Sequence, residues 1–256
     1  MSGCRPWVVK VGGALCERPS SRALLARRLA EHKGPLVVVH GGGARASAVQ
    51  RAMGGEARFV GGRRITSTAD LDAVEMALCG TVNKALVRDL IAAGRRAVGL
   101  SGCDAGLVSC DLVPGLGLVG RPVAVRPAIL SLLLRQAFTP VVAPVSLGPS
   151  GEAVNVNADE VACALAAALR SPRLLLLSDV EGLLLDGRPR AGVDSSEVDR
   201  LVRGGQVSGG MEPKLKSAAA AATRGVGDVR IAGFDGGPLR SIRGTRVRAR
   251  KEVACA

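Results

Sequence analysis

One short stretch, Leu36 to Gly43 (LVVVHGGG), limits the possible folds of this chain more than any other. Its apolar run is too short for a helix, and its β-branched residues suit a strand that is buried on both faces. The strand runs directly into three glycines, which can leave backbone N–H groups exposed because they carry no side chain. A strand, a glycine-rich turn and a following helix form an anion-binding unit. A tight turn without a ligand fits the same residues equally well.

A second stretch repeats this pattern near the amino terminus. Trp7 to Gly13 (WVVKVGG) is again a strand that ends in glycines, and it contains Lys10. A lysine inside a buried strand is unfavourable unless its ammonium group reaches a charge or a cleft. The repetition favours the functional interpretation, and it predicts one phosphate-binding cleft that is built from the ends of several strands.

Composition restricts the class of protein. The chain has 256 residues, of which 47% are hydrophobic and 22% are charged, which suits a globular protein of one large or two small lobes. No apolar run reaches the length of a membrane span, and Met1 to Lys10 has no signal-peptide core, so we expect a cytoplasmic protein. Seven cysteines without a CxxC pair, together with only two histidines, favour reduced thiols over a zinc site or a disulfide framework.

The net charge of +13 allows several interpretations. Nucleic-acid binding is disfavoured because the chain has no tyrosine and only 2% aromatic residues to stack on bases. Phosphorylated or carboxylate substrates, an acidic partner protein and an arginine-biased surface without function all remain open. A binding role stays open for the Arg-rich segment from Arg240 to Lys251.

Strand and helix patterns alternate along the chain, which predicts a three-layer α/β/α fold with an open, mainly parallel sheet that binds ligands at the carboxyl ends of its strands. The segment 54–66, with Arg63 and Arg64, suits a hairpin or lid-like loop, and 107–125 suits short antiparallel strands. We expect a surface excursion at 186–197, further strands at 97–100, 139–144, 174–177, 228–232 and 245–247, and helices at 20–32 with a serine cap, 45–53, 68–93, 128–137, 158–169 and from 209 onward.

Polar residues follow several of these strands. Asn155, Asn157 and Asp159 gather where a strand ends and a helix begins, which is more than capping needs. Lys214 is expected in the first turn of a helix, where a cation requires an anion nearby. His40 could be structural or catalytic. A site with cations and N–H groups but no evident base fits phosphoryl transfer to an ionised acceptor such as a carboxylate, and the GxxxxGK[ST] P-loop is missing.

The motifs VVKVGG, VVVHGGG, GGRRIT, VEMALCGTVNK, AVGLSG, VNVNAD, LLLLSDVEGLL and GGMEPK, in this order, resemble the amino acid kinase family. Within that family they are most similar to the acetylglutamate kinases of arginine biosynthesis, and they run from Val8 to about Ala232. The resemblance implies two lobes in one chain and ATP-dependent phosphorylation of the side-chain carboxylate of N-acetyl-L-glutamate, which gives an acyl phosphate.

The resemblance also implies roles for individual residues. Lys10 and Lys214 would stabilise the transferring phosphoryl group, and Asp159 would orient both lysines without acting as a base. Arg64 and Asn155 would hold the α-carboxylate of the substrate. Magnesium would arrive with ATP and be held mostly by phosphate oxygens, so we assign no protein metal ligand. The remaining implied positions are Gly42 and Gly43 at the substrate, and Gly12, Gly13, Ser178, Asp179, Gly182, Gly209 and Gly210 at the nucleotide.

The same resemblance implies an assembly. Residues 1–170 would form the amino-acid-substrate lobe with a dimer interface, and residues 171–256 would form the nucleotide lobe. The helix at 68–93 is apolar on more than one side, which favours this interface there and leaves an interior helix as the alternative. Because the chain begins almost at its first strand, without the N-terminal helix of arginine-inhibited hexameric relatives, we expect a homodimer that is insensitive to arginine. The end, ARKEVACA, has no assigned role.

Two other functions remain in competition. A kinase for aminoadipate attached to an acidic carrier protein, in lysine biosynthesis, would suit the charge of +13. A non-catalytic nucleotide or amino-acid sensor of the same fold is the second. The motifs GGRRIT, VNVNAD and GGMEPK favour acetylglutamate over the carrier-bound substrate, and the presence of both lysines and Asp159 argues against a sensor.

Overall fold

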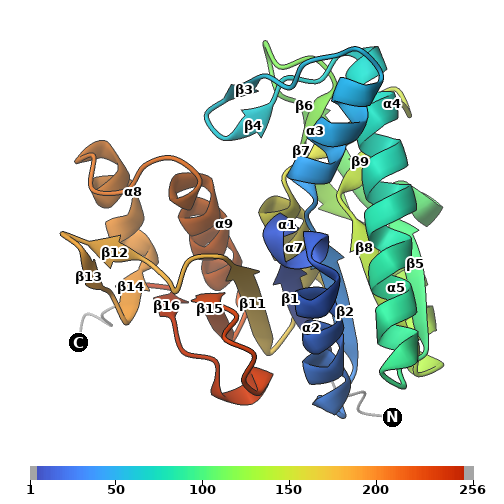
Figure 1. Ribbon diagram of the computed structural model, residues 1–256. Coiled ribbons are helices and arrows are strands. Elements are labelled where there is room, and N and C mark those ends of the chain that lie inside the picture. Colours follow the sequence, from blue (N-terminus) through green and yellow to red (C-terminus); the bar gives the residue numbers. More distant parts are fainter. Residues whose placement is uncertain (1–4, 251–256) are drawn as a thin grey trace.

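The computed structural model describes residues 5–250, so Cys4, Cys255 and most of the ARKEVACA segment lie outside the described residues. A central sheet of eight strands in the order β14-β16-β15-β11-β1-β2-β8-β5 organises the chain (Figure 1). Its adjacent strands run parallel except for β15 and β16, which confirms the predicted open and mainly parallel sheet. The strands are β1 (Trp7–Val11), β2 (Leu36–His40), β5 (Ala97–Ser101), β8 (Thr139–Ala143), β11 (Arg173–Ser178), β14 (Gly192–Asp194), β15 (Asp228–Gly233) and β16 (Thr245–Arg248).

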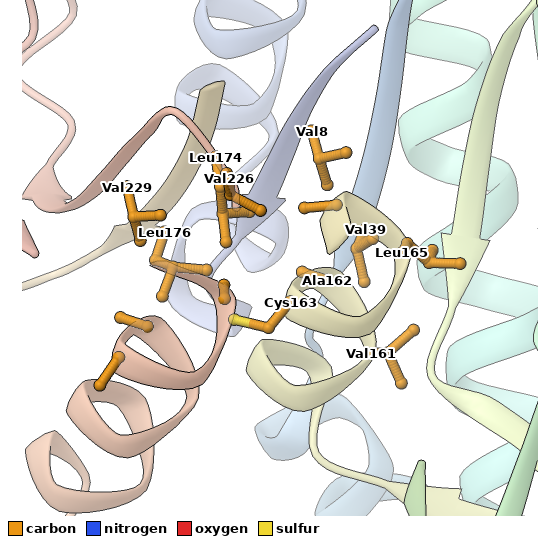
Figure 2. Packing of buried hydrophobic residues seen from close by; sticks show 14 of the residues in the cluster. Val8, Val39, Val161, Ala162, Cys163, Leu165, Leu174, Leu176, Val226 and Val229 are labelled. Atoms are coloured by element: carbon orange, nitrogen blue, oxygen red, sulfur yellow. The ribbon is translucent and has the colours of Figure 1, made fainter. Parts of the chain in front are cut away.

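Helices cover both faces of this sheet. Val8 belongs to a buried cluster with residues of α7 (Ala158–Ala168) and α9 (Met211–Thr223), and Figure 2 shows this layer around Cys163. Val9 belongs to the cluster on the other face, with residues of α2 (Pro19–Glu31) and α5 (Asn83–Ala92). Because successive side chains of a strand point to opposite faces, Lys10 shares the face of Val8 and is directed toward α7 and α9.

The predicted helix at 68–93 is a continuous helical segment in three parts. It comprises α4 (Thr68–Glu75), a π-helical stretch (Met76–Val82) and α5, and it begins with a capping box between Ser67 and Asp70. The predicted serine cap of the helix at 20–32 is wrong. That helix, α2, begins at Pro19, a residue suited to the first turn because it lacks an N–H group that would be unpaired there.

Smaller elements complete the fold. The predicted antiparallel strands at 107–125 are β6 (Val108–Leu112) and β7 (Val119–Val125), which form a small closed barrel with β9 (Val145–Leu147) and β10 (Ala153–Val156). The predicted surface excursion at 186–197 is partly wrong, because β14 joins the edge of the central sheet. The other elements are α1 (Gly13–Glu17), α3 (Gly43–Ala52), α6 (Ala128–Arg135), α8 (Ser195–Arg203), β3 (Phe59–Val60), β4 (Arg63–Arg64), β12 (Leu184–Leu185), β13 (Arg188–Pro189) and the 3-10 turns 104–106 and 239–241.

The segment 54–66 forms the predicted hairpin, β3 and β4, which projects over the carboxyl ends of the central strands (Figure 1). The five described cysteines are free thiols, and Cys16, Cys110 and Cys163 are buried. Among residues 5–250, no helix has the length and apolar character needed to cross a membrane. The boundary between two lobes near residue 170 stays a prediction.

Candidate active site

The ends of three neighbouring strands are aligned at one edge of the central sheet. Val11, the last residue of β1, pairs with His40 of β2 and with Leu177 of β11. The glycine turns that follow β1 and β2 therefore meet at the same edge, with Ser178 beside them. This edge is the carboxyl end of parallel strands, where ligands bind in open α/β sheets.

The two glycine turns lie against each other. A Cβ atom on Gly13 would lie 3.2 Å from the backbone nitrogen of Gly42, and one on Gly41 would lie 3.1 Å from that of Gly13. Gly42 also has a φ of 154°, which L-residues with side chains rarely adopt. The turns lead into α1 and α3, whose first residues are Gly13 and Gly43, so backbone N–H groups of two helix starts lie at this edge.

Three charged residues from distant parts of the chain converge beside these turns. Lys10 Nζ lies 3.0 Å from Asp159 Oδ1, and Lys214 Nζ donates a hydrogen bond of 2.8 Å to Asp159 Oδ2. The exposed fractions of Lys10, Asp159 and Lys214 are only 7%, 6% and 7%. Asp159 is held at the start of α7, where the cap residue Asn157 accepts a hydrogen bond from its backbone N–H, and Lys214 lies in the first turn of α9.

This arrangement fixes the charge of the buried carboxylate. Burial alone would raise the pKa of Asp159, but Lys10 and Lys214 together outweigh burial and hold the pKa below its usual value. Burial lowers the pKa of Lys214, and Asp159 opposes that shift. Asp159 is therefore ionised at neutral pH and has both oxygens paired, which leaves it unsuited to accept a proton from a substrate.

A small cavity of about 150 Å³ lies next to the start of α7, lined by Gly42, Gly43, Arg64 and Asn155 among others and by the two residues that precede Asp159. Arg64 is 6% exposed and lies over the ring of Phe59, 4.8 Å from its centroid. Asn155 donates a hydrogen bond of 3.2 Å to Thr66 Oγ1, which leaves its amide oxygen directed elsewhere. The structure thus brings together all four residues that the resemblance assigns to the amino-acid substrate.

A larger cavity of about 590 Å³ lies at the end of β11, and its volume falls in the range of small-molecule sites. Ser178, Asp179 and Gly182 line it, and a Cβ atom on Gly12 would lie 3.2 Å from Ser178 Cα. Among the described side chains, Ser178 Oγ is one of the few buried polar atoms without a hydrogen-bond partner. Gly209 instead lines a separate groove between the hairpin and α9, and Gly210 is the cap residue of α9.

Sequence reasoning missed residues of the larger cavity and the partner of Arg64. The larger cavity is also lined by Phe234 and Asp235, which follow β15 at the same sheet edge and could have been found from that position. Gln50, which accepts a hydrogen bond of 2.6 Å from Arg64, carries no such signal in the sequence. His40 is structural, since its Nδ1 contacts Gly41 O at 2.9 Å and its Nε2 contacts the Asn83 amide at 3.1 Å.

Known proteins with this arrangement are found by comparison of sequence and structure. Residues 5–233 match the model of the amino acid kinase family. The chain belongs to the amino acid kinase family. It is 42% identical over 245 residues to "Acetylglutamate kinase" of Chloroflexus aurantiacus, which covers 93% of this chain and 96% of that protein. It is 45% identical over 242 residues to the protein of the same name from Rubrobacter xylanophilus, covering 94% and 90%.

A solved structure agrees with this assignment. The crystal structure of smu.665 from Streptococcus mutans UA159 superposes with a TM-score of 0.86 at 28% sequence identity, covering 96% of this amino acid kinase and 99% of the other chain. The sequence-based prediction of the family and of its fold is therefore confirmed.

Proposed function

We propose that this chain transfers the γ-phosphoryl group of ATP to the side-chain carboxylate of N-acetyl-L-glutamate, as an acetylglutamate kinase of arginine biosynthesis. The observation that carries the proposal is the pairing of two ammonium groups with opposite oxygens of one buried carboxylate, at a sheet edge that two cavities border. The nearly full-length relatives at 42% and 45% identity, both named acetylglutamate kinase, support the choice of substrate.

The chemistry follows from these charges. A carboxylate acceptor is already ionised at neutral pH, so the reaction needs no general base, and Asp159 is unsuited to be one. Phosphoryl transfer depends mainly on alignment and on neutralising the charge of the moving group. Lys10 and Lys214 supply positive charge at this point, and the N–H groups of the glycine turns supply hydrogen bonds to phosphate and acceptor oxygens.

The small cavity suits the amino-acid end of the substrate. Its volume of about 150 Å³ matches a small acid better than a long tethered group. Arg64 brings a positive charge into it, and within residues 5–250 no ion pair joins this guanidinium to a carboxylate. We assign Arg64 and Asn155 to the α-carboxylate of acetylglutamate on this basis.

Magnesium is expected as the companion of ATP. Both oxygens of Asp159 are paired with lysines, so the carboxylate nearest the phosphoryl position is not suited to hold a metal ion. The phosphate oxygens of ATP would therefore provide most of the ligands, and magnesium would add positive charge to that of the two lysines.

The direct test is to trap the acyl phosphate with hydroxylamine. Purified protein with ATP and magnesium is expected to give the hydroxamate from free N-acetyl-L-glutamate and much less from aminoadipate attached to an acidic carrier protein. Turnover of the carrier-bound substrate alone would contradict the proposal. ATP binding without hydroxamate from either substrate would favour a sensor.

We also propose a homodimer located in the cytoplasm. Met76 and Ile91, on the helical segment predicted to form the interface, are 56% and 55% exposed although both are apolar. Light scattering is expected to give twice the mass of 26.1 kDa. Replacement of Ile91 by Glu is expected to shift the protein toward the monomer, and a monomeric wild-type protein would exclude this assembly.

A further inference from the structure

The guanidinium of Arg64 is held by hydrogen bonds to α3 that the proposed function does not account for. Three acceptors on one face of α3 hold its guanidinium: Nη1 donates to Gln50 Oε1 at 2.6 Å, and Nη2 donates to Gly43 O at 2.8 Å and to Ser47 Oγ at 2.7 Å. Positions 43, 47 and 50 lie close together on a helix surface because four and three residues separate them. All three acceptors are uncharged.

Gln50 is the only one of these acceptors that is a buried side chain, with 3% of its surface exposed. Its amide nitrogen donates to Glu56 O at 3.1 Å and to Asp70 Oδ1. Its amide oxygen faces Arg64, so each end of the amide is fixed and the group cannot rotate without losing a bond. A negative charge thus exists near Arg64, but one amide group separates it from the guanidinium.

Asp70 is itself held in place at the start of α4. Ser67 donates to Asp70 Oδ2 from its backbone N–H at 2.9 Å and from its hydroxyl at 2.7 Å. Burial raises the pKa of Asp70, but the hydrogen bonds from Ser67 and Gln50 outweigh it and lower the pKa below its usual value. Asp70 is therefore an ionised group with a fixed position and a satisfied set of donors.

We propose that Gln50 is a positioning residue that orients Arg64 through an uncharged acceptor and thereby leaves the charge of Arg64 to the carboxylate of the substrate. A carboxylate at position 50 would make the same hydrogen bond, but it would neutralise the guanidinium and compete with an anionic ligand. The neutrality of the Gln50 side chain, and not only its shape, then sets the affinity of the protein for acetylglutamate. The inference rests on the proposed function, because it takes Arg64 to bind that substrate.

The sharpest test is to exchange the charges of the two partners. In Gln50→Glu/Asp70→Asn, the net charge is unchanged and an amide still faces a carboxylate, but the negative charge now contacts Arg64. We expect the Kd of acetylglutamate, measured by calorimetry without ATP, and its KM to rise at least about tenfold. We expect kcat at saturating acetylglutamate and the KM for ATP to stay within about threefold. An unchanged Kd in the folded double variant would overturn the proposal.

A second variant keeps the proposal testable if the double variant does not fold. Gln50→Met keeps the approximate volume but removes the acceptor, and we expect a rise of about threefold to tenfold in KM for acetylglutamate with an unchanged KM for ATP. The matched control is Gln136→Met at the exposed end of α6, which should leave both KM values unchanged. An unchanged KM for acetylglutamate in Gln50→Met would also overturn the proposal.

Failure of this inference is distinguishable from failure of the proposed function. If the wild-type protein forms no hydroxamate from acetylglutamate, the proposed function fails. If it does, and Arg64→Lys raises the KM for acetylglutamate while neither Gln50 variant does, only the positioning role of Gln50 fails. If the carboxylate at position 50 is the cause of weak binding, acidification that protonates it should restore part of the affinity in the double variant relative to wild type.

Discussion

The two buried cation sites of this cleft are built in opposite ways. Lys10 and Lys214 share one carboxylate, Asp159, with one ammonium group on each oxygen. Within the part of the chain that the structure describes, Arg64 donates hydrogen bonds only to uncharged acceptors. At the first site, the carboxylate of Asp159 holds two ammonium groups together, and the three side chains carry a net charge of one positive unit. At the second site, no carboxylate among the described residues pairs with Arg64, so its full positive charge is available to the ligand. Under the proposed function, the phosphoryl end is thus pre-assembled, and the acceptor end depends on its substrate for charge balance.

The largest effect is expected from removing the shared anion. Asp159→Asn preserves the shape of the side chain but leaves two buried ammonium groups without a counter-charge, which should lower the free energy of unfolding by about 3–5 kcal/mol. Urea denaturation monitored by circular dichroism measures this loss. Asp111→Asn, at an exposed ion pair of 3.9 Å, is the matched control and should cost less than about 1 kcal/mol. Equal losses in both variants would show that the shared carboxylate is not needed to hold the lysines.

The next largest effect is on turnover. Lys10→Ala or Lys214→Ala removes one preorganised positive group and should lower kcat by about 10²-fold or more. Because the remaining lysine and Asp159 then balance each other, each of these variants should lose less stability than Asp159→Asn. Lys216→Ala, whose ammonium group pairs with the exposed Glu212, should keep the wild-type kcat. A kcat within a few-fold of wild type for both site variants would show that neither lysine contributes to the reaction.

Substitution of Arg64 should change the KM for acetylglutamate rather than kcat. Arg64→Ala should raise the KM for acetylglutamate by about 10-fold to 100-fold, the range expected for a lost charge-assisted contact, and should leave the KM for ATP unchanged. The exposed Arg200 pairs with Glu197 and lines neither cavity, so Arg200→Ala is a matched control and should change the KM by less than about threefold. An equal rise in the KM for ATP would place Arg64 at the wrong end of the cleft.

The smallest effect concerns the stability contribution of His40, at the end of β2, and it depends on pH. Burial lowers the pKa of His40 from 6.5 to about 4, so the unfolded chain binds a proton below pH 6.5 that the folded chain does not. Stability is therefore lost as pH falls from 6.5 toward 4, by about 1 kcal/mol at pH 5.5. Urea denaturation at pH 7.5 and 5.5 should show a smaller difference for His40→Gln than for wild type. His32 titrates in both proteins, and an equal difference would mean that His40 does not contribute.

Much of the phosphoryl end could be predicted from the sequence because local patterns determine it. Alternation along β1 sends Lys10 to the face that carries α7 and α9, and helix starts place Asp159 and Lys214 at the same edge. The glycines after two strands mark that edge directly. These features depend on the alternation of residues along a strand and on the spacing of glycines and helix starts, which can be read from a single sequence.

The acceptor end depends on contacts that no local pattern encodes. Gln50 meets Arg64 and Asp70 only because the hairpin and α4 pack beside α3, and its sequence neighbours give no sign of this. The short strand β14 was missed because three residues carry too little periodicity. The serine cap at 20–32 failed because Pro19 already starts the helix. Tertiary packing decided the first two outcomes, whereas the third was a local signal at Pro19 that was overlooked.

The contact between the two glycine turns has a consequence for the distance between them. Since neither Gly13 nor Gly41 has room for a side chain at their junction, the backbone segments beneath acceptor and donor press directly on each other. A side chain at either position would require the facing backbone to shift by a few tenths of an ångström, so the two glycines set how closely the turns approach each other.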